Sequence, residues 1–156
     1  MAGQAPETTA APTTTAPRSF SGELTSTDGY RYRITLDVGD RLAAASAEEC
    51  ATTAPPAGQA HVRVTLTVAN LDTTRPAPSP PLRIELAAGG SPRPVLVRDP
   101  GGTCTFTPRV SSLGAGESVA YRGTTPAVAS DAAPGSAGAV EVNVSETRFS
   151  LSAPVP

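Results

Sequence analysis

The sequence predicts an all-β protein, an antiparallel β-sandwich of seven to nine strands behind a disordered N-terminal stalk. Three observations predict this fold class. From Phe20 onward, apolar and polar residues alternate with a period of two, which is typical of strands with one buried face. Connections rich in Pro and Gly separate these short runs. No segment carries the i, i+3, i+4 apolar stripe of an amphipathic helix, and the strand–helix alternation of a parallel sheet is absent.

The N-terminal segment differs in composition from the rest of the chain. Residues 2–18 are rich in Thr, Ala and Pro and contain one acidic and one basic residue. Such a segment buries too little apolar surface to offset its conformational entropy. We therefore expect a disordered stalk over residues 1–19, suited to tethering an extracellular domain, and a sandwich domain over residues 20–156. A frayed terminus or a leftover of expression is the alternative.

The first strands form a predicted hairpin. Within Tyr30–Val38, the even positions are aromatic or aliphatic and the odd positions are Arg, Thr and Asp. One face of this strand should be buried, which places its two Tyr residues inside and its two Arg residues outside. The Asp28-Gly29 pair precedes the strand and follows Phe20–Thr25, so a tight turn is expected between them.

Further strands continue the alternation toward the C-terminus. They are expected at His61–Val68, Leu82–Leu86, Val95–Val97, Cys104–Thr107, Val119–Tyr121 and Val140–Val144. The inward residues are even-numbered in the last of these but odd-numbered at Phe149 and Leu151, which predicts a bulge or tight turn near residues 145–147. The segment Arg41–Glu49 is the best helical candidate, but its apolar residues are almost all Ala, so at most one short helix is expected.

Three loops interrupt the alternation. They are Thr52–Gln59, Thr73–Pro81 and Thr125–Gly138. The second is dense in proline and should form a stiff polyproline II segment. We interpret it as a rigid bridge between the sheets, and the alternative is a ligand for a proline-recognition groove. The candidate partner loop consists of Arg75, Pro76, Pro78, Pro80 and Pro81.

The chain has two cysteines, Cys50 and Cys104. Their distance in the sequence excludes a CxxC redox or zinc motif, and a disulfide between them would pin neighbouring segments. A bridge across so long a loop would stabilise the fold by roughly 4 kcal/mol and would imply an oxidising compartment. Two buried, reduced thiols in a cytosolic protein are the alternative.

Composition and charge exclude several classes of function. The 12 basic residues are all Arg, so no lysine can form a Schiff base, and with 14 acidic residues the formal net charge is −2. Without a basic cluster, we expect no nucleic-acid partner. No apolar stretch approaches the roughly 20 residues that span a bilayer. The chain starts without the charged and apolar regions of a signal peptide, so we expect a signal sequence to lie outside it.

The sequence predicts no catalytic, cofactor-binding or metal-binding residue. The single histidine, His61, is expected on the outward face of its strand, and no Ser lies in a nucleophile motif. One His and two distant Cys are not a zinc ligand set. Four acidic residues near the first long strand could approach calcium but lack EF-hand spacing, so a solvated acidic surface is expected. They are Asp37, Asp40, Glu48 and Glu49.

Three segments carry a resemblance to a known family. They are Gly29–Leu36 (GYRYRITL), His61–Asp72 (HVRVTLTVANLD) and Leu113–Gly123 (LGAGESVAYRG). Together they resemble immunoglobulin-like domains of unknown function in secreted lipoproteins of Gram-positive, actinobacterial bacteria. The resemblance covers about residues 20–151 and implies an immunoglobulin-like sandwich of secreted or lipoprotein origin, with Met1 standing where a lipidated Cys would have been removed. The family brings no catalytic residue, and Thr73–Pro81 is longer than its usual turn.

We therefore expect a non-enzymatic interaction module at the cell envelope or outside the cell. It would recognise an unidentified protein or envelope partner through its Pro-rich loops, and it would reach a membrane only through a lipid anchor absent from this chain. A structural subunit of a surface assembly, built through strand edges or the stalk, is the alternative. A small hydrolase is the third hypothesis, although the sequence singles out no nucleophile or acid pair.

Overall fold

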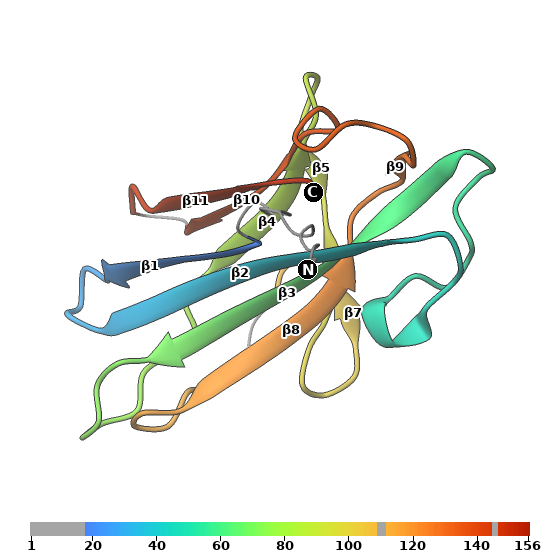
Figure 1. Cartoon of the computed structure of the whole chain (residues 1–156). Helices are drawn as coiled ribbons and strands as arrows, with labels where there is room; N and C mark the ends of the chain where they lie inside the picture. The colour runs from blue at the N-terminus through green and yellow to red at the C-terminus, as the bar shows by residue number, and fades with distance from the viewer. Residues whose placement is uncertain (1–17, 109–111, 145–146) are drawn as a thin grey trace, which may run out of the picture.

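The computed structural model describes residues 18–108, 112–144 and 147–156, which form two antiparallel sheets and no α-helix (Figure 1). In the seven-stranded sheet the order is β1-β2-β3-β8-β6-β7, with β9 paired to β3, and in the four-stranded sheet it is β11-β10-β4-β5. The strands are β1 (Ser19–Thr25), β2 (Arg31–Leu42), β3 (Gln59–Asn70), β4 (Leu82–Ala87), β5 (Arg93–Pro94), β6 (Leu96–Arg98), β7 (Cys104–Thr105), β8 (Ser118–Thr124), β9 (Val128–Ala129), β10 (Ala139–Val144) and β11 (Ser150–Pro154). The predicted all-β, sandwich-like fold is confirmed, and the predicted stalk falls mostly on residues 1–17, outside the described residues.

One apolar core joins the two sheets. In the β2–β3 pair, Ile34 lies opposite Val68 and Leu36 opposite Leu66, and all four side chains are fully buried. The four-stranded sheet contributes residues such as Ile84, which is also fully buried in the same cluster. Burial of each such side chain stabilises the fold by about 1.5–3 kcal/mol. The alternation of β2 and β3 therefore predicted their buried faces correctly.

The number of strands is larger than predicted. The described residues form eleven strands, and three of them, β5, β7 and β9, contain only two residues each. A two-residue strand cannot show an alternating pattern, so the sequence could not reveal them. In the segment Arg41–Glu49, the first two residues end β2, and a short 3₁₀ helix, η2, occupies Ala47–Glu49. This agrees with the expectation of at most one short helix.

The sequence predicted a tight turn between β1 and β2 and a change of the inward positions between β10 and β11. The β1–β2 hairpin turns through Gly29, whose φ of 86° is the left-handed conformation that glycine adopts readily. In the β10–β11 pair, Val140 lies opposite Ala153 and Val142 opposite Leu151, which confirms the change from even to odd inward positions. The connection includes residues 145–146, which lie outside the described residues.

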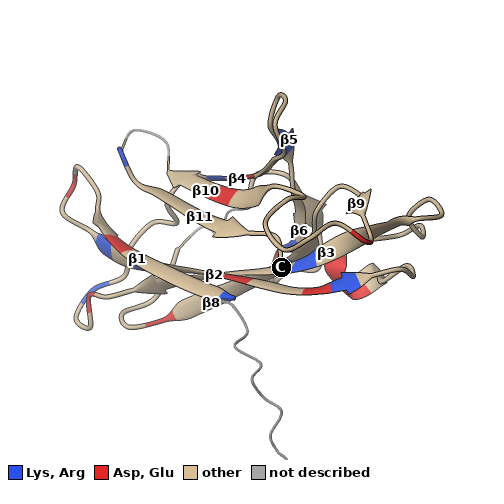
Figure 2. Cartoon of the chain, turned by 45° about the horizontal axis from the view of Figure 1, so that its top comes forward, with Lys and Arg blue, Asp and Glu red and all other residues tan. Residues whose placement is uncertain are grey.

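The outer faces of the sheets are polar, and Figure 2 shows basic and acidic residues dispersed over strands and loops of both sheets. On the seven-stranded sheet, Glu23 lies opposite Arg33 in register and accepts a hydrogen bond from it at 2.8 Å. Both side chains are about half exposed, so this ion pair contributes at most about 1 kcal/mol. The predicted outward orientation of Arg33 is therefore confirmed.

A bulge in β2 redirects one arginine in a way that the alternation did not predict. The register shifts between Val38 and Arg41, which brings Arg41 opposite the fully buried Val62. From there its guanidinium donates hydrogen bonds to the carbonyl oxygens of Pro156 (2.9 Å), Ala129 (2.8 Å) and Ala132 (2.9 Å). Arg41 thus ties the end of β2 to the β9 loop and to the segment after β11.

Substitution of Arg41 by Met should lower the free energy of unfolding by about 1.5–3 kcal/mol, because three carbonyl groups lose a charged donor. Urea denaturation of the variant and the wild type measures this difference. Arg31→Met, at an exposed position of the same strand, is the matched control and should change stability by less than about 0.5 kcal/mol. Equal losses in the two variants would contradict the proposed role of Arg41.

Candidate functional site

The Pro-rich segment 73–81 joins β3 of one sheet to β4 of the other, as the bridge interpretation expects. In its middle, Ala77 exchanges two backbone hydrogen bonds of 2.8 Å with Leu113. The hydroxyl of Tyr32 donates a hydrogen bond of 2.5 Å to the carbonyl oxygen of Pro78. Burial raises the pKa of Tyr32, so this phenol stays protonated and keeps donating at neutral pH. These contacts fix the middle of the segment.

The five residues of the candidate partner loop do not share one environment. Arg75, Pro76 and Pro78 are exposed, whereas Pro80 is buried and Pro81 is half-buried. The second half of the segment turns inward because it leads directly into β4, whose first residue, Leu82, belongs to the core. The part of the candidate partner loop that a partner can reach therefore narrows to Arg75, Pro76 and Pro78.

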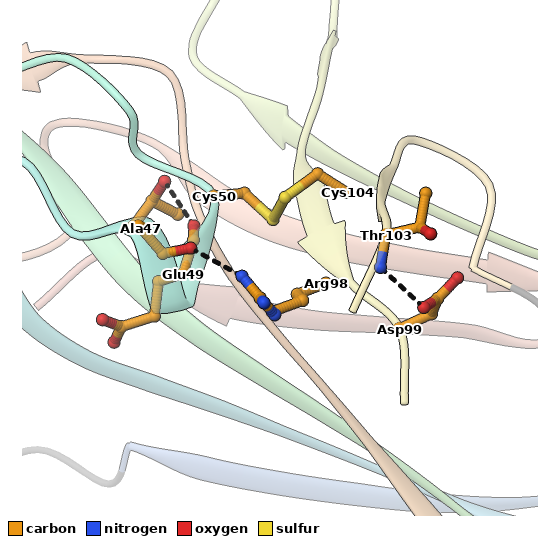
Figure 3. Close-up of a disulfide and its surroundings, with 8 residues drawn as sticks. Ala47, Glu49, Cys50, Arg98, Asp99, Thr103 and Cys104 are labelled. Atoms are coloured by element: carbon orange, nitrogen blue, oxygen red, sulfur yellow. Dashed lines mark hydrogen bonds between the residues drawn. A yellow bond between two sulfur atoms is a disulfide. The ribbon is translucent and has the colours of Figure 1, made fainter. Parts of the chain in front are cut away.

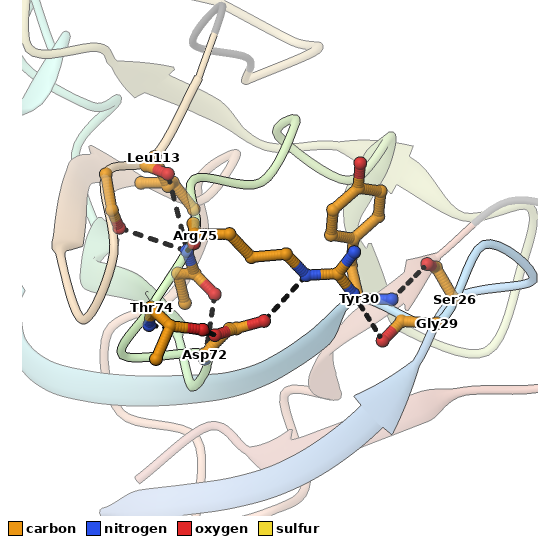
Figure 4. A network of polar contacts seen from close by, with 9 residues as sticks. Ser26, Gly29, Tyr30, Asp72, Thr74, Arg75 and Leu113 are labelled. Carbon is orange, nitrogen blue, oxygen red and sulfur yellow. Dashed lines mark hydrogen bonds and ion pairs between the residues drawn. The ribbon is translucent and has the colours of Figure 1, made fainter.

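Arg75 forms the centre of a polar network at the tip of this loop (Figure 4). Its guanidinium carbon lies 4.5 Å from the centroid of the Tyr30 ring, within the distance of a cation–π interaction. Its Nε donates to Asp72 Oδ2 at 2.7 Å, and its Nη2 donates to the carbonyl oxygen of Gly29 at 3.3 Å. We call these four residues the Arg75 network. It joins the β1–β2 hairpin to the Pro-rich segment and holds an exposed arginine in one conformation.

Asp72 begins the turn that carries this network. Its Oδ1 accepts hydrogen bonds from the backbone N–H (2.9 Å) and the hydroxyl (2.8 Å) of Thr74. Together with the hydrogen bond from Arg75, these bonds lower the pKa of Asp72 to about 2. An Asp followed two residues later by such a backbone bond is an Asx turn, which the sequence after β3 could have indicated.

Acid should weaken the turn through Asp72. Because its pKa in the folded protein is about 2 and its ordinary value is 3.8, the ionised carboxylate stabilises the fold above pH 4, and this contribution disappears as the pH falls through about 2. Urea denaturation between pH 5 and pH 2 measures this effect. The free energy of unfolding of the wild type should exceed that of Asp72→Asn most at pH 5, and the difference should shrink toward pH 2. A difference that does not change with pH would contradict this linkage.

Asn70 is the last residue of β3, and its side chain holds the Pro-rich segment in place. The sequence did not indicate this role. The buried Asn70 side chain donates to the carbonyl oxygens of Arg75 (2.9 Å) and Gly114 (3.0 Å). Its Oδ1 accepts from the backbone N–H of Asp72 at 2.9 Å. The Leu113–Gly123 segment noted for its sequence thus begins with the turn that Asn70 holds against the Pro-rich loop.

A hollow of about 120 Å³ lies beside the Arg75 network. Its walls combine the rings of Tyr30 and Tyr32 with Pro78 and Pro80, and Asp28 lies at its edge in the β1–β2 turn. Such aromatic and proline surfaces bury apolar groups of a ligand at little cost in side-chain entropy. The loop end of the sandwich therefore offers a fixed cation next to a small hollow lined by aromatic, proline and polar residues.

The cysteines form the predicted disulfide. Cys50 and Cys104 are joined across a sequence separation of 54 residues (Figure 3). The bridge connects the residue after η2 with β7, and Arg98 on β6 adds a 3.0 Å hydrogen bond to the carbonyl oxygen of Ala47. The disulfide indicates that the protein folds in an oxidising environment.

The other residues considered for chemistry lie apart from this loop end. His61 is half-buried and its Nδ1 lies 2.8 Å from the carbonyl oxygen of Thr125, so that nitrogen carries the proton. Glu49 is buried and bonded to Arg63 and Ser46; burial raises its pKa, but these bonds outweigh burial and lower it overall. Within residues 18–108, 112–144 and 147–156, no three His, Cys, Asp or Glu are grouped to hold a metal ion. The same residues include no helix long and apolar enough to cross a membrane.

Compared with known protein families, with curated proteins and with solved structures, the chain shows no match. Its own geometry defines it as an all-β, sandwich-like protein with one disulfide. The resemblance to secreted immunoglobulin-like domains accordingly stays a prediction.

Proposed function

We propose that this chain is a non-enzymatic interaction module with an immunoglobulin-like fold, which works outside the cell or in the cell envelope. It binds a protein or envelope partner through the loop end formed by the Pro-rich segment and the β1–β2 turn. The observation that carries the proposal is the Arg75 network, because it presents a fixed, exposed arginine over a half-buried tyrosine ring beside a hollow.

Residue type and rigidity both favour partner binding at this end. Arg and Tyr are enriched among the residues that dominate binding energy at protein interfaces. Arg75 already has its side chain ordered by Asp72 and Gly29, so little conformational entropy is lost when a partner binds. Pro76 and Pro78 extend the same exposed surface, and their rings fix the backbone.

The proposed location follows from the disulfide and from the sequence. Disulfides persist in secreted and surface proteins and are rare in the reducing cytosol. The Thr/Ala/Pro-rich composition of residues 1–19 suits a tether, and the resemblance to lipoprotein domains points to the same compartment. A lipid anchor would supply the attachment to a membrane.

Binding through the loop end can be tested by capture from envelope extracts of the producing cell. The wild type should retain an envelope component, and Arg75→Ala should reduce its retention at least about tenfold. Arg18→Ala is the matched control, because Arg18 is also ion-paired with an aspartate and has similar exposure (43% against 48%) at the opposite end of β1. This control should bind like the wild type.

Two outcomes would overturn the proposal. If the wild type retains no envelope component, the chain is not an interaction module of this kind. If Arg75→Ala and Arg18→Ala bind equally well, the partner does not use the loop end. Thermal unfolding of each variant shows that lost binding does not arise from lost folding.

A further inference from the structure

A second exposed feature lies away from the loop end, on the segment that follows β7. Phe106 is 51% exposed and is the one large hydrophobic side chain among the described residues with such exposure. It comes two residues after Cys104, so the disulfide anchors the strand that leads to it. A single exposed apolar residue is common on protein surfaces. The surroundings of Phe106 distinguish it from such isolated residues.

Phe106 stands between two hollows. One has a volume of about 300 Å³ and is lined by Arg83 and Glu85 of β4, Pro94 of β5 and Phe106 itself. The other has a volume of about 370 Å³ and shares Phe106 and Pro94 with the first. We call the first the β4 hollow. The surface thus carries an exposed aromatic ring and, beside it, a depression lined by both apolar and charged residues.

The β4 hollow carries one basic and one acidic side chain from β4. Arg83 and Glu85 both line it, and neither forms an ion pair with any other described residue. Glu85 also lies directly opposite Glu141 of β10, and like charges in that position destabilise a strand pair. A partner that brings a positive charge to Glu85 and a negative charge to Arg83 would relieve this arrangement.

A second copy of the chain can supply both of these charges. A two-fold symmetric interface uses the same patch on both subunits, so the patch must contain its own projection and its own depression, and charges of both signs. We propose that two copies associate through this surface, with Phe106 of each inserted into the β4 hollow of the other and Arg83 of each paired with Glu85 of the other. The net charge of −2 per copy opposes this contact only weakly. The small patch makes the dimer a weak, concentration-dependent one.

Sedimentation velocity of the purified chain from about 1 µM to about 1 mM tests the dimer. The wild type should pass from monomer to dimer within this range, and Phe106→Ala should weaken the association at least about tenfold. Arg83→Glu should also weaken it, because two acidic residues then meet. The exchange Arg83→Glu/Glu85→Arg should restore it, because each copy again offers both signs.

The double exchange separates this dimer from other forms of self-association. A wild type that stays monomeric throughout, or a dimer that Phe106→Ala leaves unchanged, overturns the proposal. Failure of the exchange to rescue Arg83→Glu overturns the two-fold pairing. Arg75→Ala should dimerise like the wild type, so loss of the dimer and loss of envelope binding are distinguishable, and thermal unfolding checks that each variant folds.

Discussion

The double substitution Cys50→Ala/Cys104→Ala should lower the free energy of unfolding by about 4 kcal/mol, the largest effect that we expect from removing one interaction. The bridge closes a loop across 54 residues, so its loss returns much conformational freedom to the unfolded chain. Side-chain contacts also hold the segment around η2: Arg98 bonds to the carbonyl oxygen of Ala47, Arg63 pairs with Glu49, and the Thr124 hydroxyl bonds to the carbonyl oxygen of Glu49 at 3.2 Å. None of these contacts restricts the unfolded chain as the disulfide does. Because small domains are stable by only about 5–15 kcal/mol, the variant should unfold in much less urea.

Urea denaturation followed by far-UV circular dichroism measures this loss, since the chain has no Trp to serve as a fluorescent probe. Cys104 is exposed, so a reductant should lower the wild-type midpoint in the same direction. The cysteine-free variant is the control and should not respond to the reductant. A loss below about 1 kcal/mol would show that the disulfide contributes little to the fold.

The second large effect is expected at Asn70. Replacing it by Ala should cost about 2–4 kcal/mol, because the partly buried carbonyl groups of Arg75 and Gly114 and the N–H of Asp72 lose their partner together. The same change releases the backbone of Arg75, so retention of the envelope partner should fall as well. Urea denaturation measures the first effect and capture from envelope extracts measures the second.

The chain offers a matched control for this prediction. Its other asparagine, Asn143, is half-buried on β10. Asn143→Ala should cost less than about 1 kcal/mol and leave capture unchanged. If the two alanine variants lose similar stability, the Asn70 side chain does not support the loop end as proposed.

The alternation of apolar and polar residues was sufficient to predict the buried faces of the main strands. Alternation in β2, β3, β4 and β10 reports which side chains point the same way, and this depends only on the period of an extended chain. The disulfide was predictable because only Cys50 and Cys104 could pair. Gly29 marked the first hairpin because few other residues adopt its backbone conformation.

The candidate site was predicted only in part. The density of prolines indicated segment 73–81, but the sequence did not show that Pro80 turns inward while Arg75 stacks on Tyr30. Asn70 ends an ordinary alternating strand, and nothing local shows that its amide would reach Gly114. These contacts join segments far apart in the chain, so they exist only once the strands have paired.

The sequence by itself determined the all-β class, the inner and outer faces of the long strands and that the two cysteines could pair only with each other. Packing of the two sheets decided the rest: the bulge that brings Arg41 to the carbonyl groups near Pro156, the strands of two residues, and the exposure of Phe106 between two hollows. The physical reason is that alternation is a property of neighbouring residues. Register shifts, edge strands and hollows depend instead on which distant segments meet.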